Sequence, residues 1–242
     1  MNTIALFKIM GKNDLTLVRR DSLLCLLTAL PVVYALVLRW AVPPITRALT
    51  DKVDLTLYYP LIVSYLLICV PPILFGMVIG FLLLDERDDD TLSALRVTPM
   101  SMNMYLFYRI MFPGVICIML TMLIVPIAQL TTTPTSRLLL ITLLASTEAP
   151  IFALCMVLIA KNKVQGFAIM KAMGAIIALP LVAYFISPGY QMLIWVVPNF
   201  WPMKLFWIAT GDQANFANYF IGGLIFHAAL NFYLLRRFHK TF

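Results

Sequence analysis

Long apolar runs separated by short charged stretches dominate the pattern of this chain. Six runs reach the roughly 20 residues that a membrane-spanning helix needs, near 22–42, 57–84, 104–130, 137–160, 168–187 and 215–235. Several carry proline in mid-run, at Pro31, Pro71, Pro72, Pro113, Pro126 and Pro180. Neighbouring helices can satisfy the carbonyls that proline leaves free in lipid, so we expect kinks and not breaks. The pattern predicts an all-α polytopic membrane protein with six transmembrane helices.

The first twenty residues are amphipathic. Ile4, Phe7 and Met10 fall on one helical face, while Gly11 and Asn13 are expected to interrupt the helix. The pattern of residues 1–20 is typical of a helix lying at the membrane interface. A frayed basic terminus is the alternative.

The segment between the fifth and sixth runs, residues 187–215, is too apolar for a solvated loop. We expect it to be re-entrant, dipping into the outer leaflet as short helices separated at Pro198 and Pro202. An ordinary seventh span would conflict with the proline spacing and with the distribution of basic residues.

Charge sets the orientation, because Lys and Arg are enriched in cytoplasmic loops. If both termini share one side, that side holds 13 of the 18 basic residues. They are Lys8, Lys12, Arg19, Arg20, Arg87, Arg96, Arg109, Lys161, Lys163, Lys171, Arg236, Arg237 and Lys240. The sequence therefore predicts a multi-pass protein of the cytoplasmic (inner) membrane with both termini in the cytoplasm.

Composition excludes soluble classes of protein. The 242 residues are 62% hydrophobic and 12% charged, with a mean hydropathy of +0.93, far from the range of soluble domains. The net charge of +7 does not indicate nucleic-acid binding, because the basic residues lie at the ends of apolar runs. We expect one transmembrane domain over 1–242, embedded in the lipid bilayer.

The loop from Asp85 to Pro99 concentrates charge. Five of the eleven acidic residues fall within six positions there, and such a cluster cannot lie in hydrocarbon. Asp88, Asp89 and Asp90 would cap a short helix from Thr91 to Val97, with Leu92 and Leu95 on one face and a stop at Pro99. The loop 85–99 is predicted to present a small amphipathic helix to the cytoplasm; a merely solvated loop is the alternative.

Motifs for catalysis are missing from the sequence. It has no phosphate loop, no HExxH and no GxSxG, so we expect no catalytic and no metal site. One alternative starts from Asp85 and Asp89, because a DxxxD face can chelate magnesium and a diphosphate, as in intramembrane prenyltransferases. A second aspartate-rich motif is missing. His227 lies inside the last run and is expected to be a packed neutral imidazole.

Glu148 lies near the centre of the fourth run, where an ionised carboxylate is costly. One interpretation is a carboxylate that lines a wet cavity and meets a cationic or polar substrate. The other is a protonated or hydrogen-bonded glutamic acid that fastens two helices, with Pro150 freeing a carbonyl nearby. Both remain open.

Two stretches carry a family resemblance. DERDDDTLSALRVTPMSMNMYLFYR resembles the first cytoplasmic loop of ATP-binding cassette (ABC) type 2 export permeases, and KNKVQGFAIMKAMG, with EAP at 148–150, is similar to the fluoroquinolone export permease branch. Asp90 stands where the family often has glycine. The resemblance implies a coupling helix that docks on two copies of a separate ABC ATPase, which bind ATP and Mg²⁺; this chain would hold no cofactor. It also implies a second permease chain, identical or homologous.

The candidate site residues follow from these readings. ATPase docking is assigned to Arg87, Asp88, Asp89, Asp90, Thr91, Leu92, Leu95 and Arg96, and the second cytoplasmic loop to Lys161, Asn162, Lys163 and Gln165. A pathway for an amphipathic small molecule, peptide or lipid would be lined from the first, second and fifth helices by Tyr34, Tyr65, Phe75, Met173 and Tyr184, with Glu148 contributed by the fourth helix. The sequence thus predicts the membrane subunit of an ATP-driven exporter that works by alternating access; no partner nucleic acid is expected.

Overall fold

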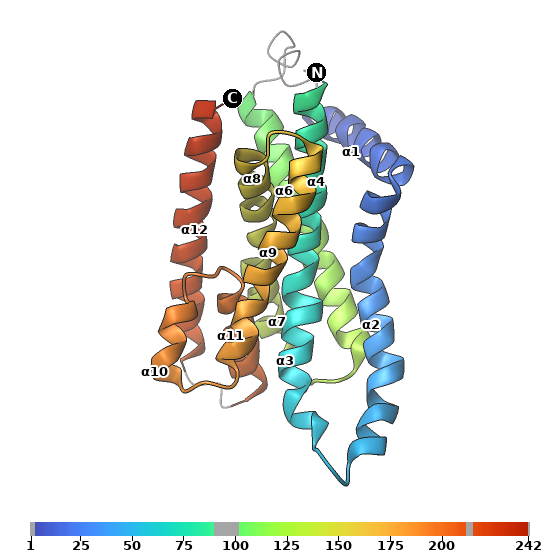
Figure 1. Cartoon of the computed structure of the whole chain (residues 1–242), viewed down its shortest axis with the longest axis vertical. Helices are drawn as coiled ribbons and strands as arrows, with labels where there is room; N and C mark the ends of the chain where they lie inside the picture. Colours follow the sequence, from blue (N-terminus) through green and yellow to red (C-terminus); the bar gives the residue numbers. More distant parts are fainter. Residues whose placement is uncertain (1–2, 90–101, 212–214, 242) are drawn as a thin grey trace.

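The computed structural model describes residues 3–89, 102–211 and 215–241, and within these ranges the chain is helical with no strand. Six helical segments are long and apolar enough to cross a membrane: Ser22–Leu49, Leu55–Asp88, Phe107–Ala128, Thr135–Ile159, Lys163–Ala183 and Phe216–Thr241. The predicted all-α, six-span architecture is confirmed. Both ends of the chain lie at the same end of the bundle (Figure 1), which we call the terminal end.

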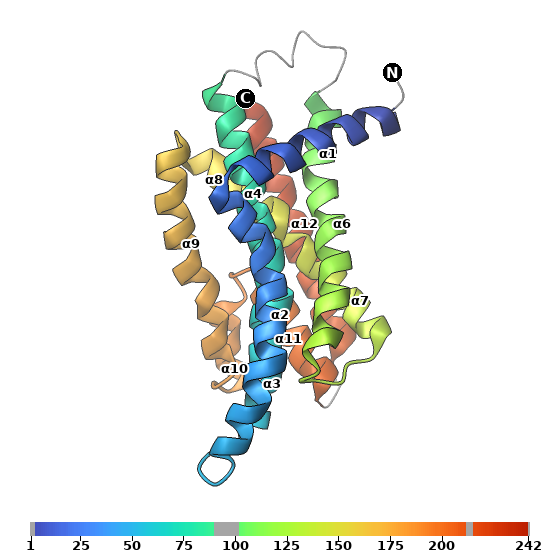
Figure 2. The ribbon, with the colours of Figure 1, turned by 90° about the vertical axis from the view of Figure 1, so that its right-hand side faces the viewer.

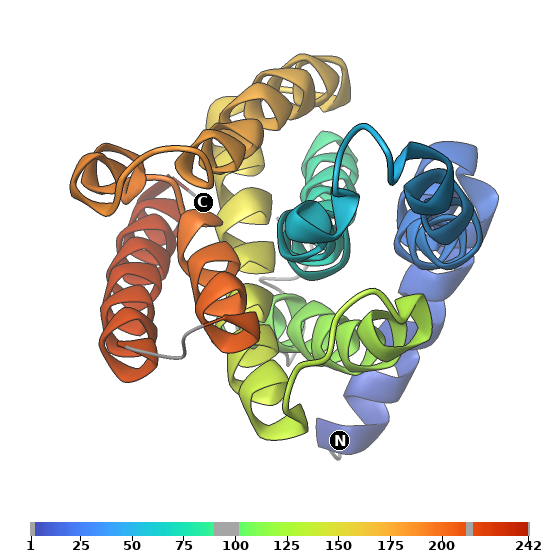
Figure 3. The same cartoon turned by 90° about the horizontal axis from the view of Figure 1, so that it is seen from below.

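The second and fourth spans form the centre of the bundle, with 78% and 72% of their apolar windows buried against 17–29% for the other four spans. Seen along the bundle, helices α4 (Val70–Asp88) and α8 (Glu148–Ile159) lie between the peripheral spans (Figure 3). Their backbones approach closely at Gly76, where an added Cβ would lie 2.4 Å from the carbonyl oxygen of Ala149. Only glycine fits such a contact.

The second span changes its helical geometry along its length. It starts as a 3₁₀ turn, η1 (Leu55–Tyr58), continues as α3 (Tyr59–Val63), widens into the π-helical η2 (Ser64–Cys69) and then becomes α4. The wide turn directly precedes Pro71 and Pro72, which have no N–H group for the carbonyls one turn earlier. The span adapts to its prolines without breaking, as predicted.

Prolines inside the first, third and fifth spans are likewise accommodated. α2 (Ser22–Leu49) continues through Pro31, α6 (Met102–Ala128) through Pro113 and Pro126, and α9 (Lys163–Ala183) through Pro180. The fourth span differs from the expected single helix. It is divided at Thr147 into α7 (Thr135–Ser146) and α8, because a proline at position 150 has no N–H to bond the carbonyl four residues earlier.

The N-terminal helix α1 (Thr3–Arg20) lies crosswise over the terminal end (Figure 2), as expected of an interfacial helix. The predicted interruption at Gly11 and Asn13 is wrong, because α1 continues through both positions. A Cβ atom added at Gly11 would lie 3.5 Å from the hydroxyl of Tyr108 on α6. Glycine has a low helix propensity, but at this position α1 packs against α6.

The segment between the fifth and sixth spans folds into short helices, as predicted. These are α10 (Pro188–Gln191), η3 (Met192–Ile194) and α11 (Phe200–Thr210), and they precede α12 (Phe216–Thr241). Pro198 lies in the break before α11, but the predicted break at Pro202 is wrong. Pro202 occupies the first turn of α11, where a missing N–H costs nothing.

Candidate functional site

The predicted docking loop, residues 85–99, begins in the last turn of α4. Asp90, Thr91, Leu92, Leu95 and Arg96 lie outside the described residues, whereas residues 85–89 are described. The expected end of the second span at residue 84 is wrong, because α4 continues to Asp88. The first part of the acidic cluster is therefore helical, and its side chains turn back onto the bundle.

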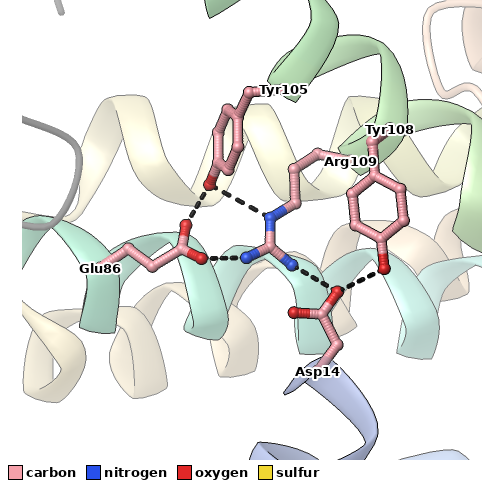
Figure 4. A network of polar contacts seen from close by, with 5 residues as sticks. All are labelled: Asp14, Glu86, Tyr105, Tyr108 and Arg109. Carbon is pink, nitrogen blue, oxygen red and sulfur yellow. Dashed lines mark hydrogen bonds and ion pairs between the residues drawn. The ribbon is translucent and has the colours of Figure 1, made fainter. Parts of the chain in front are cut away.

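A five-residue network lies at this point (Figure 4). The Arg109 guanidinium of α6 donates through Nη1 to Asp14 Oδ2 of α1 at 2.8 Å and through Nη2 to Glu86 Oε1 of α4. Tyr108 donates to the same Asp14 oxygen at 2.8 Å, and Tyr105 donates to Glu86 Oε2. Arg109 Nε also donates to the Tyr105 hydroxyl at 3.1 Å. The network joins α1, α4 and α6.

Burial makes this network costly to disrupt. Arg109 is only 4% exposed and Asp14 only 7%. Desolvated charges persist only when partners compensate them, and here two carboxylates face one guanidinium. From the sequence, Arg109 was predicted only to be an orienting charge, and Asp14 was not a candidate residue. The i, i+4 spacing of Tyr105 and Arg109 on α6 was the available signal.

A second ion-pair cluster lies beside the first. Lys163 Nζ, at the start of α9, lies 3.0 Å from Asp21 Oδ2 and 2.9 Å from Asp85 Oδ2. Asp21 also caps α2, accepting the backbone N–H groups of Leu23 and Leu24. Burial raises the pKa of the Asp21 carboxyl, but the bonds from Lys163 and from the two N–H groups outweigh it and lower that pKa below its ordinary value.

Arg87 makes a third connection. Its guanidinium donates to the carbonyl of Val157 at 3.2 Å and to that of Ala160 at 2.8 Å, where α8 ends. These carbonyls have no partner within their own helix. Asp85, Glu86 and Arg87 thus bind α9, α6 and α8 respectively, and we call these three residues the α4 hub.

The second predicted loop is short and serves mainly to start α9. Asn162 Oδ1 accepts the backbone N–H of Gln165, and Gln165 Oε1 accepts that of Lys161, both at 2.9 Å. This is a reciprocal capping arrangement. Lys163 alone among the four candidate residues of this loop reaches the α4 hub.

The arrangement does not favour the diphosphate alternative. Asp85 is engaged by Lys163, and Asp89 is exposed beyond the end of α4. Among the residues that the structure describes, no group of three His, Cys, Asp or Glu side chains could hold a metal ion.

Glu148 starts α8 and is fully buried, at 0% exposure. Neither carboxylate oxygen has a hydrogen-bond partner among the described residues. It does not line the cavity beside it, although Ser146, Thr147 and Pro150 do. The helix-fastening bond is thus not formed in this conformation, and the carboxyl group is enclosed in the protein.

His227 joins the break in the fourth span to the connection before α11. Its Nδ1 lies 2.7 Å from Thr147 Oγ1, and its Nε2 lies 3.0 Å from the carbonyl oxygen of Pro198. The ring is fully buried, as predicted. It also lines a cavity of about 400 Å³ between α6, α7, α8 and α12, together with Asn231.

The remaining pathway candidates do not gather at one point. Tyr184 donates to the carbonyl of Leu57 at 2.5 Å and holds the end of α9 against η1. Tyr34, Tyr65 and Met173 are half-buried and pack against the core from α2, η2 and α9. Phe75 instead lines a groove between α1, α2, α4 and α6.

Comparison with known proteins bears on this arrangement. Residues 14–235 match the family described as "Fluoroquinolones export permease protein Rv2686c-like". The chain is 35% identical over 236 residues, 94% of its length and 92% of theirs, to the fluoroquinolones export permease proteins MT2760 and Rv2686c of two Mycobacterium tuberculosis strains, CDC 1551 / Oshkosh and ATCC 25618 / H37Rv. No solved structure matches. The chain therefore belongs to the Rv2686c-like family of fluoroquinolone export permeases, confirming the family resemblance read from its sequence.

Proposed function

We propose that this chain is the transmembrane subunit of an ABC exporter, which moves an amphipathic small molecule outward by alternating access driven by a separate ATPase. The α4 hub carries the proposal. Asp85, Glu86 and Arg87 immediately precede the predicted docking loop and bind three other spans. A displacement of that loop would therefore be transmitted to α6, α8 and α9 together.

The sequence supports an external source of energy, because it holds no nucleotide motif. Two ATPase subunits would bind ATP and Mg²⁺ and grip the loop through Leu92, Leu95 and Arg96. The acidic residues Asp88 and Asp89, which are exposed, would set the register of the contact by charge complementarity. The bundle would then lie in the inner membrane with its terminal end facing the cytoplasm. The excess of Lys and Arg at that end favours this orientation.

A second permease chain would complete the pathway. α2 and α9 flank α4 (Figure 3) and expose apolar side chains, such as Val37 at 52% and Ile176 at 53%. A two-fold contact through these faces would bring Tyr34, Tyr65 and Met173 of both chains toward one interface. The substrate would be a drug of the fluoroquinolone class, as the names of the relatives suggest.

The test is co-expression of the chain with a candidate ABC ATPase and purification of the complex. Norfloxacin should stimulate ATP hydrolysis by the complex, and the L95D/R96D variant should lose co-purification of the ATPase. R87M should keep the ATPase bound but lose drug stimulation, because the connection from the loop to α8 is cut.

R236M is the matched control, since Arg236 is exposed on α12, and it should behave as the wild type. Hydrolysis of ATP by the isolated chain would contradict the proposal. So would intact co-purification and stimulation in L95D/R96D.

A further inference from the structure

An apolar groove of about 280 Å³ lies between the N-terminal helix α1 and the spans α2, α4 and α6. Val18, Phe75, Val78 and Ile116 contribute to its walls. Leu15 and Phe112 also line it and are 52% and 41% exposed, so the groove opens at the surface of the bundle near the terminal end. Its volume lies just below the range of ligand sites, which starts at about 300 Å³, and suits one arm of a larger molecule.

Two side chains give this groove its polar character, and both offer only acceptors. Asp14 Oδ2 is occupied by Arg109 and Tyr108. Both of these bonds end on Oδ2, and no contact among the five residues drawn in Figure 4 reaches Asp14 Oδ1. Thr28 Oγ1 already donates to the carbonyl of Cys25 at 2.9 Å, which leaves its lone pairs.

The charge of the surroundings selects the sign of a ligand. The carboxylates of Asp14 and Glu86 face the single guanidinium of Arg109, which leaves one negative charge in excess. No basic side chain is among the described residues that line the groove. The Asp14 side chain is only 10% exposed, so this charge lies where water screens it weakly. An anion would be repelled, and a neutral apolar group would leave the two acceptors without donors.

We propose that this groove binds the cationic end of an amphipathic molecule, namely an ammonium group attached to an apolar body. The ammonium N–H groups would donate to Asp14 Oδ1 and Thr28 Oγ1, and the apolar body would lie against Phe75 and Ile116. The ligand would reach the groove sideways, past Leu15 and Phe112, from the lipid leaflet at the terminal end. This deepens the proposed export function, on which it rests, by giving the substrate a charge and a first site of contact.

Photolabelling of the full-length chain in lipid nanodiscs tests the site without ATP turnover. The probe is an aliphatic diazirine that carries a primary ammonium, and its partner is the same diazirine with a hydroxyl group instead. Mass spectrometry should find the ammonium probe on peptides of α1, α4 and α6 that line the groove. The alcohol should label them about tenfold less, as for the loss of one charge-assisted hydrogen bond.

Two variants and one matched control locate the binding. D14N should reduce groove labelling by the ammonium probe about tenfold. I116W should abolish it by filling the groove while leaving the Arg109 network intact, which separates a lost site from a damaged fold. I118W, two residues along α6, fills instead the cavity near His227 and should label as the wild type.

Equal labelling by the two probes would overturn the proposal, as would labelling that survives in I116W or disappears in I118W. Because the assay needs no ATPase, the two ideas fail separately. Intact groove labelling without drug-stimulated hydrolysis would overturn only the ABC assignment, and the reverse result would overturn only the groove.

Discussion

The Arg109 network makes a quantitative prediction about stability. Replacing Arg109 with Met removes the donors that face Asp14 and Glu86 and leaves two carboxylates without their cation at a site where Arg109 is 4% exposed. Breaking a buried ion pair by removing one partner costs about 3–5 kcal/mol. For a chain of this size, about 1 kcal/mol lowers the melting temperature by roughly 2–4 °C, so R109M should melt about 6–20 °C below the wild type.

The assay is the loss of the monodisperse peak in size-exclusion chromatography after heating the detergent-solubilised chain. The exposed Arg20 gives the control R20M, which should remain within about 0.5 kcal/mol of the wild type. The triple variant D14N/E86Q/R109M removes all three charges and should recover most of the loss, because replacing a whole buried ion pair is often neutral. A normal melting temperature for R109M would refute the reasoning, and so would a triple variant as unstable as R109M.

Three further predictions use the same chain. G76A places a methyl group 2.4 Å from a backbone oxygen of α8 and should destabilise the fold by about 1–3 kcal/mol in thermal melts; G174A, where nothing lies within 4 Å, is the control and should not. The lowered pKa of Asp21 means that its stabilisation is full above the ordinary value of 3.8 and is lost as the pH falls through the lower folded-state value. The melting temperature of D21N should therefore depend less on pH than that of the wild type below about pH 4, and parallel curves would contradict this. H227L leaves the carbonyl of Pro198 without its donor and should cost about 1–3 kcal/mol, measured as the same melting shift; an unchanged melt would show that the bond contributes nothing.

The partners of the α4 hub could not be predicted from the sequence. A run of charged residues after GFLLL indicated an exposed loop, and Asp88 and Asp89 are exposed. Asp85, Glu86 and Arg87 instead bind groups of residues that lie 19 to 78 positions away along the chain. Local sequence contains the charges but not their partners, which depend on the order in which the spans pack.

The sequence by itself determined the six spans, because the cost of exposing a backbone or a charge to hydrocarbon depends on each segment alone. It also determined that helices would pass through most of their prolines. Only the tertiary structure decided that α4 and α8 form the centre and that Asp14 of α1 meets Arg109. These features arise from contacts between helices, and the apolar stretches of all six spans are too alike to specify which faces meet.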